Sequence, residues 1–210
     1  KTGTFKKAFP DRFFDCGIAE NNMIAAAVGM SLCGKIPFAS SFAMFAAGRS
    51  FEQVRNAIGY PHNNVKIGAT HAGITVGEDG ATHQCNEDIA LMRTIPGMII
   101  LNPADDTEAR LAVKAAIEHD GPVYLRFGRM AVPVYYGADY EFKIGKGVKM
   151  ADGNDVALIA TGIEVEQALI ARELLAADGI SASVVNISTI KPLDEELVVA
   201  EATRCGCVVT

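Results

Sequence analysis

A glutamate stands where a helix is expected to begin, directly after a short apolar run. Glu20 follows residues 13 to 16, which have the composition of a buried strand, and a turn at residues 17 to 19. An acid in a first helical turn commonly complements the helix dipole and needs no other role. At the rim of a sheet, a partly desolvated carboxylate can also hold a proton near neutral pH. Glu20 is therefore a candidate for proton chemistry, with helix capping as the alternative.

Two phenylalanines, Phe42 and Phe45, lie at helical spacing in the segment from residue 39 to 48. Two aromatic side chains at that spacing are often part of a core. The neighbouring alanines and Gly48 are small and leave space beside the rings, so a planar heterocycle can stack there. The segment predicts either a piece of core or the aromatic wall of a binding site.

Two histidines and two acids share one glycine-rich segment, residues 71 to 83. His71, Asp79 and His83 supply directional donors and acceptors that suit a hydroxylated or anionic substrate. A metal site is the alternative, but the segment has no H-x-x-x-H or H-x-H spacing. We therefore predict substrate recognition here and assign no metal ligand.

Two arginines stand at the end of the predicted strand at residues 123 to 127: Arg126 lies within it, and Arg129 follows it by two residues. The guanidinium fork matches the oxygens of a phosphate group, so a sugar phosphate is a suitable ligand. A pair of solvated surface arginines is the alternative.

The elements that must position these residues alternate between short apolar runs and helical patterns. This alternation predicts an α/β fold with a mostly parallel sheet flanked by helices, followed by a second, smaller α/β domain. We divide the chain into a first domain at residues 1 to 136, a linker at 137 to 150 and a second domain at 151 to 210.

Ligands bind such sheets at the carboxyl ends of the strands, which predicts that the four candidate segments share one rim. Strands are expected at residues 13–16, 36–40, 65–69, 98–101, 123–127, 156–160 and 183–187 and near 208, and helices at 20–33, 41–60, 86–94, 105–119 and 164–177.

Composition excludes several classes of protein. With 19 basic and 25 acidic residues, the net charge of −6 disfavours a nucleic-acid footprint. No apolar stretch reaches the roughly 18 residues of a membrane span. The five cysteines are odd in number and scattered through apolar segments, which indicates a reducing, cytoplasmic location. The sequence lacks G-x-G-x-x-G, P-loop and G-x-S-x-G motifs.

These segments, in this order, resemble the transketolase family of thiamine-diphosphate enzymes across essentially the whole chain. Residues 77 to 84, G-E-D-G-A-T-H-Q, are close to the family signature G-E-D-G-P-T-H-Q, with Ala81 in place of proline. Residues 13 to 20 match the family segment that ends in G-I-A-E, and residues 191 to 194 match a K-P-L-D of the C-terminal domain. The resemblance implies a pyrimidine-binding domain followed by an incomplete transketolase C-terminal domain.

The resemblance also implies roles for the candidate residues. Glu20 hydrogen-bonds the ring nitrogen of the cofactor's aminopyrimidine and so promotes removal of the thiazolium C2 proton. Phe45 stacks on the pyrimidine with Phe42 beside it, whereas Gly48 stands where the family often has a third aromatic. In the substrate site, His71 and Arg126 contact the phosphate, and Asp79 and His83 recognise sugar hydroxyls and the carbonyl end. Glu20 and His83 form the catalytic set.

No G-D-G motif occurs in the chain. In the family that motif binds the diphosphate and Mg, so the resemblance implies that an N-terminal transketolase subunit carrying the diphosphate-binding domain supplies them. A homodimer or an α2β2 assembly follows, inactive without that half. The expected reaction moves a two-carbon ketol unit between sugar phosphates, in the pentose phosphate pathway. The alternatives are a 1-deoxyxylulose-5-phosphate synthase, which usually has G-A-D-G in the loop, a 2-oxoacid dehydrogenase beta subunit, or a non-catalytic assembly subunit.

Overall fold

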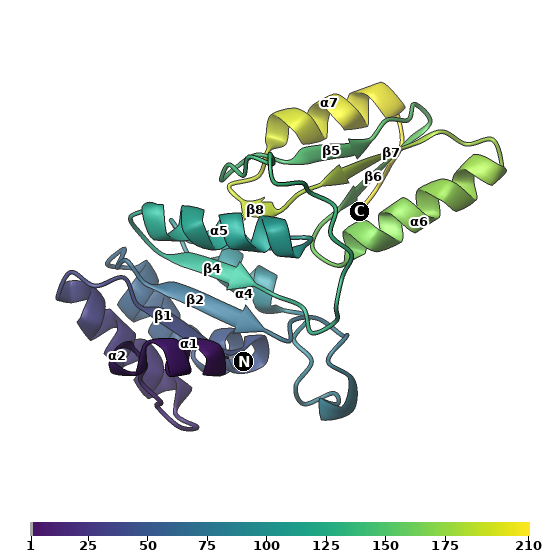
Figure 1. The fold of residues 1–210 in the computed structure, drawn as a ribbon. Coiled ribbons are helices and arrows are strands. Elements are labelled where there is room, and N and C mark those ends of the chain that lie inside the picture. The colour runs from purple at the N-terminus through teal and green to yellow at the C-terminus, as the bar shows by residue number, and fades with distance from the viewer. Residues whose placement is uncertain (1) are drawn as a thin grey trace.

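The computed structural model describes residues 2 to 210 and contains two β-sheets with helices on their faces (Figure 1). The larger sheet is built from β1 (Phe38–Phe42), β2 (Lys66–Thr70), β3 (Ile99–Leu101), β4 (Val123–Arg126) and β8 (Thr189–Lys191). The smaller sheet contains β5 (Val148–Ala151), β6 (Val156–Ala160), β7 (Ala182–Asn186) and β9 (Val208–Val209). The α-helices are α1 (Gly3–Ala8), α2 (Glu20–Leu32), α3 (Phe51–Gln53), α4 (Asp88–Arg93), α5 (Asp106–Glu118), α6 (Glu164–Ala177) and α7 (Glu195–Cys205).

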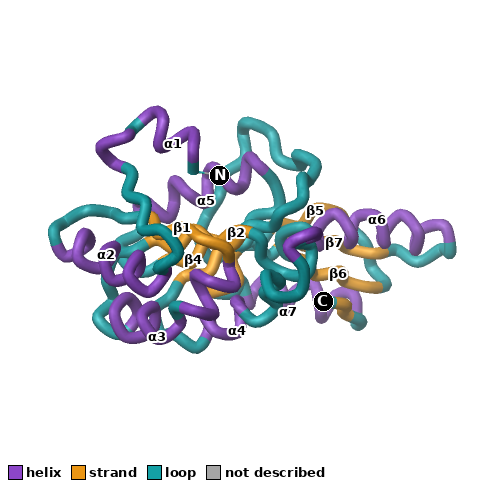
Figure 2. Tube along the Cα trace, turned by 90° about the horizontal axis from the view of Figure 1, so that it is seen from below, coloured by secondary structure: helices purple, strands orange, loops and turns teal. Residues whose placement is uncertain are grey.

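The larger sheet has the strand order β1-β2-β4-β3-β8, and its first four strands are parallel. Helix α5 lies on one face and α3 and α4 lie on the other (Figures 1 and 2). In the smaller sheet, β6 pairs in parallel with β7 and β9, and β5 is antiparallel to β7. These layers confirm the predicted fold class, a mostly parallel helix-flanked sheet followed by a smaller α/β unit. None of the helices within residues 2 to 210 is long and apolar enough to cross a membrane.

Residues 13 to 16 do not form the predicted strand. They are irregular, and Phe14 is 65% exposed while Ile18, two residues after the run, is 92% exposed. The larger sheet ends at β1 in the described part of the chain, so this run has no neighbouring strand to pair with. An apolar run becomes a strand only where a ladder partner satisfies its backbone. The strand prediction at residues 13 to 16 was therefore wrong.

The helix predicted between residues 41 and 60 is present but irregular. It consists of the π-helical segments Met44–Arg49 and Val54–Gly59 on either side of α3. π-helical turns are rare and are frequent at functional sites, because they change the direction in which side chains project. The first of these turns directly follows β1 and carries Phe45.

The strand β8 joins the second domain to the sheet of the first. It pairs antiparallel with β3, and Lys191 Nζ donates to the carbonyl oxygens of Arg93 at 3.0 Å and Ile95 at 2.7 Å. Glu108, fully buried in α5, accepts from Tyr140 Oη at 2.8 Å and from Asn186 Nδ2 at 3.0 Å. The later part of the chain is thus tied to the larger sheet by the backbone pairing of β8, and the smaller sheet is tied to α5 by the buried carboxylate of Glu108.

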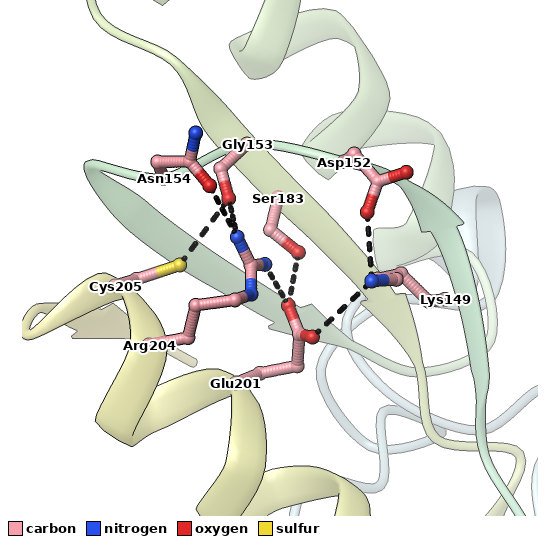
Figure 3. A network of polar contacts seen from close by, with 8 residues as sticks. All are labelled: Lys149, Asp152, Gly153, Asn154, Ser183, Glu201, Arg204 and Cys205. Carbon is pink, nitrogen blue, oxygen red and sulfur yellow. Dashed lines mark hydrogen bonds and ion pairs between the residues drawn. The ribbon is translucent and has the colours of Figure 1, made fainter.

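A polar network fastens α7 to the smaller sheet (Figure 3). Glu201, which is 4% exposed, accepts a hydrogen bond from Ser183 Oγ at 2.6 Å and pairs with Arg204 and with Lys149 Nζ, the last at 3.6 Å. Arg204 also donates to the Gly153 carbonyl. Because every charge here has a partner within the network, we interpret it as structural.

Lys66, the first residue of β2, is fully buried at the amino end of the strand. Its Nζ donates to the carbonyl oxygens of His119 at 2.8 Å and Gly121 at 2.6 Å. Burial lowers the pKa of Lys66 to about 8, although the charge of Asp120 opposes the shift. An unfolded lysine keeps its proton up to about pH 10.4, so between these values the unfolded chain binds more protons than the folded one.

We therefore expect Lys66 to contribute a rise in the free energy of unfolding with pH between these two values, by at most about 1.4 kcal/mol per pH unit. Urea unfolding of the wild type and of Lys66→Met across this interval measures this contribution as the difference between the two profiles, and the variant should lose it. Lys114→Met, which removes an exposed lysine of α5, should keep it. Parallel pH profiles for the wild type and Lys66→Met would contradict the assignment.

Candidate functional site

Glu20 begins α2 and turns its carboxylate into the rim formed by the carboxyl ends of the parallel strands. The residue is 8% exposed, and its Oε2 lies 2.8 Å from Arg49 Nη1. Oε1 receives a hydroxyl hydrogen bond from Ser41 of β1 at 3.5 Å. The residue before the helix, Ala19, provides no side-chain cap. Glu20 is thus a buried, paired carboxylate rather than an exposed capping acid.

Two opposing effects determine the protonation state of Glu20. Burial raises its pKa, whereas the hydrogen bond from Arg49, its own backbone, the charge of Arg49 and the Ser41 hydroxyl lower it. The net pKa lies below the usual value for glutamate. Glu20 is consequently ionised at neutral pH and can accept a hydrogen bond from a nitrogen donor.

Four rings, those of Phe42, Phe45, His71 and His83, form a cluster that Arg49 links to Glu20. The rings of Phe42 and His71 are stacked with centroids 3.9 Å apart, and those of Phe42 and Phe45 are near-parallel at 6.2 Å. His83 meets Phe45 edge-on at 5.2 Å. The rings come from the end of β1, from the π-helical turn that follows it and from the 71–83 loop, so two adjacent segments and one distant loop build one aromatic wall.

The loop that carries both histidines begins with an unusual backbone conformation. His71 is 4% exposed and has φ +58°, a left-handed conformation that is uncommon for residues other than glycine and often occurs at functional sites. Gly77 has φ +78°, and a Cβ there would lie 2.7 Å from Arg129 Nη1. Glycine at this position therefore lets the Arg129 guanidinium lie against the loop.

Arg126, at the end of β4, is held by a buried acid. Its Nε lies 2.8 Å from Asp88 Oδ2, and the same oxygen accepts from Tyr124 Oη at 2.9 Å. Asp88 is fully buried, and the Arg126 side chain is 17% exposed. A Cβ added to Gly73 would lie 3.4 Å from Arg126 Nη2, so the outer end of the guanidinium faces the 71–83 loop. The pair fixes Arg126 and leaves its terminal nitrogens at the rim.

The remaining predicted residue, Asp79, lies at the outer turn of the loop. It ends the 3-10 turn Gly77–Asp79 and is exposed, and within residues 2 to 210 its carboxylate makes no hydrogen bond or ion pair. His83 is half-buried, and its Nδ1 is 2.9 Å from Thr82 Oγ1. The described residues contain no group of three or more histidine, cysteine, aspartate or glutamate side chains suited to a metal ion. Six predicted side chains thus line the rim, and Asp79 stands at its outer edge.

Two contributors to this rim escaped the sequence analysis, namely Arg49 and Asp88. Arg49 follows Phe45 by four residues, so their shared helical face was a usable signal. Asp88 had no such signal, because an acid at the start of a helix is common and its partner is 38 residues away. Only the pairing of distant segments identifies it.

Comparisons with known proteins identify the family of the chain. A family model of the transketolase pyrimidine-binding domain matches residues 1–134, and one of the transketolase C-terminal domain matches residues 145–210. A transketolase C-terminal section of Methanocaldococcus jannaschii is 52% identical over 200 residues, with 94% of this chain and 63% of that protein covered. A 6-deoxy-6-sulfo-D-fructose transketolase subunit of a Clostridium species is 43% identical, with 98% and 64% covered.

Among solved structures, a split-gene transketolase described as an inactive β4 tetramer has a TM-score of 0.92 and 51% identity. The alignment covers 100% of this chain and 68% of that one. This chain spans less than two thirds of the length of both sequence relatives. From the two domain matches and these likenesses, the chain belongs to the transketolase family, in which it corresponds to the C-terminal section with the pyrimidine-binding domain and the C-terminal domain.

Proposed function

We propose that this chain is the pyrimidine-binding half of a thiamine-diphosphate-dependent transketolase, which transfers a two-carbon ketol unit between sugar phosphates. The observation that carries the proposal is the buried, ionised carboxylate of Glu20, which Arg49 links to the ring of Phe45. Membership of the transketolase family supports it. We also propose the division into residues 1–136, 137–150 and 151–210.

The side chains at the rim fit the aminopyrimidine part of thiamine diphosphate. Glu20 Oε1 has one weak hydroxyl contact at 3.5 Å, so it retains capacity to accept a hydrogen bond from a ring nitrogen. Phe45, with Phe42 beside it, offers an aromatic surface, and Ala46 and Ala47 behind them are fully buried. When bound, the cofactor supplies the carbon nucleophile that takes up the two-carbon unit. Glu20 binds the ring nitrogen and keeps its proton in place.

We assign the substrate to the opposite side of the ring cluster. The terminal nitrogens of Arg126 and the ring of His71 bind the phosphate group, because a guanidinium fork matches phosphate oxygens. Asp79 and His83 bind sugar hydroxyls and the carbonyl end, and His83 moves a proton there as the second catalytic residue. Arg129, which lies against Gly77, adds positive charge to the same side.

A second subunit is needed to complete this site. The chain lacks the G-D-G motif through which the family binds the diphosphate and Mg, so we assign both to an N-terminal transketolase subunit. Large apolar side chains exposed near Glu20, among them Phe14 and Ile18, offer a surface for that partner. We expect a homodimer or α2β2 assembly. A cytoplasmic location is consistent with the free thiols of all five cysteines.

Reconstitution tests the activity. The chain is mixed with its diphosphate-binding subunit, thiamine diphosphate and Mg, and ketol transfer from xylulose 5-phosphate to ribose 5-phosphate is followed. We expect turnover in the mixture and none in either subunit alone. Pyruvate with glyceraldehyde 3-phosphate is the parallel assay for deoxyxylulose-phosphate synthesis, which the G-E-D-G loop disfavours. If the two subunits are folded and associated but the complex is inactive in both assays, the chain is a non-catalytic assembly subunit.

A further inference from the structure

Arg49 contacts both residues to which the proposed function assigns the pyrimidine ring. Its Nη1 lies 2.8 Å from Glu20 Oε2, and its guanidinium carbon lies 4.5 Å from the centre of the Phe45 ring. A guanidinium over an aromatic face is attracted to it, so the side chain holds the carboxylate and the ring at once. The π-helical turn Met44–Arg49 places Phe45 and Arg49 on the same side.

The two oxygens of Glu20 are not equivalent. Oε2 accepts a charged hydrogen bond at 2.8 Å, while Oε1 has the hydroxyl of Ser41 at the 3.5 Å limit. Within residues 2 to 210, Arg49 is the one charged side chain that contacts Glu20, and it reaches the carboxylate from the π-helical turn while Ser41 does so from β1. Arg49 therefore restrains the carboxylate through one oxygen and leaves the other able to bind a ligand.

We propose that Arg49 is a positioning residue: it orients Glu20 through Oε2 and restrains Phe45 through its ring face, so that Oε1 is the oxygen that accepts from the aminopyrimidine ring nitrogen. This inference rests on the proposed function and deepens it. A side chain held at two points needs little reorganisation when the ligand binds, which is how a supporting residue contributes to catalysis.

Arg49 also supplies the positive charge that opposes the effect of burial on the pKa of Glu20. Burial raises the pKa of Glu20, and the hydrogen bond and charge of Arg49 bring it below the usual value. Without Arg49 the burial remains, so the pKa of Glu20 rises and a smaller fraction is ionised at neutral pH. A protonated Glu20 carries no negative charge and has an O–H that donates, so it is a weaker acceptor for the hydrogen bond from the ring nitrogen.

The first test uses the chain alone. Carboxyl-carbon NMR titrations follow Glu20 in the wild type, Arg49→Met and Arg49→Lys, with the resonance assigned from its loss in Glu20→Gln. We expect a higher pKa of Glu20 in Arg49→Met and partial return toward the wild-type value in Arg49→Lys, which keeps a charge but not the fork. Arg55→Met is the matched control, since Arg55 is exposed and, within residues 2 to 210, its side chain hydrogen-bonds only to Asn56. An unchanged pKa of Glu20 in a folded Arg49→Met chain would overturn the inference.

The second test uses the reconstituted complex with thiamine diphosphate and Mg. We expect kcat of Arg49→Met to fall about tenfold to a hundredfold. The acidic limb of its pH profile should move to higher pH, KM for the sugar phosphates should not change, and Arg49→Lys should recover part of the loss. Tighter thiamine-diphosphate binding in Arg49→Met with an unmoved acidic limb would instead make Arg49 a side chain that the cofactor displaces. No turnover in the wild-type complex would defeat the proposed function, while the NMR titration would still decide the role of Arg49.

Discussion

Replacement of Glu20 by glutamine is expected to reduce ketol transfer by the reconstituted complex at least about a thousandfold. Glutamine keeps the size of the side chain but carries no charge to stabilise a protonated ring nitrogen. Because the step affected precedes any contact with sugar, exchange of the cofactor's C2 proton for deuterium should fall with the turnover. Quenched-flow NMR of the bound cofactor measures that exchange directly.

Glu52→Gln is the matched control for this substitution. Glu52 is also a first-turn acid, but it is exposed and, among the residues that the structure describes, its side chain accepts hydrogen bonds only from Gln53 and Asn56. Both turnover and exchange should remain at the wild-type level in that variant. If Glu20→Gln exchanged its C2 proton as fast as the wild type, Glu20 would be an ordinary first-turn acid. The thiamine-diphosphate assignment would then lose its principal residue.

Replacement of Asp88 by alanine is expected to cost about 3–5 kcal/mol of folding free energy. Asp88 is fully buried, and it is the acceptor for both Arg126 Nε and Tyr124 Oη. Its removal leaves a largely buried guanidinium without a counter-charge and a buried hydroxyl without an acceptor. Urea unfolding at neutral pH measures the loss. The same variant should raise KM for the sugar phosphate, because Arg126 is no longer fixed at the rim.

A second ion pair with the same N–O distance provides the control for Asp88→Ala. Asp106 and Arg110 of α5 are also 2.8 Å apart, but both side chains are largely exposed. Exposed pairs contribute little to stability because water screens them, so Asp106→Ala should leave the unfolding midpoint nearly unchanged. Equal destabilisation by the two substitutions would show that burial of the Asp88 pair does not determine its importance.

Local patterns in the sequence identified most of the elements. Residues 156 to 160 and 164 to 177 form the predicted strand and helix, because five consecutive apolar residues and a long run of helix formers specify them without help from distant segments. The helix predicted at residues 105 to 119 is α5, and Asp105 caps it, because its side chain accepts from Glu108 N. The run at residues 13 to 16 had the same local signal but lacked a partner strand.

In the candidate site, too, some features follow from the sequence and others depend on contacts between distant segments. The sequence by itself predicted that Phe42, Phe45, His71, His83 and Arg126 belong to one rim, because parallel strands bring their carboxyl ends to the same edge of a sheet. Glu20 was placed there by a strand at residues 13 to 16 that does not form, and in the structure it reaches Ser41 and Arg49 from the start of α2. Only the tertiary structure decided which oxygen of Glu20 is restrained, that Arg49 restrains it, and that Asp88 fixes Arg126. Spacing along the chain specifies the face of an element, but contacts between elements depend on the packing of segments that lie 29 and 38 residues apart.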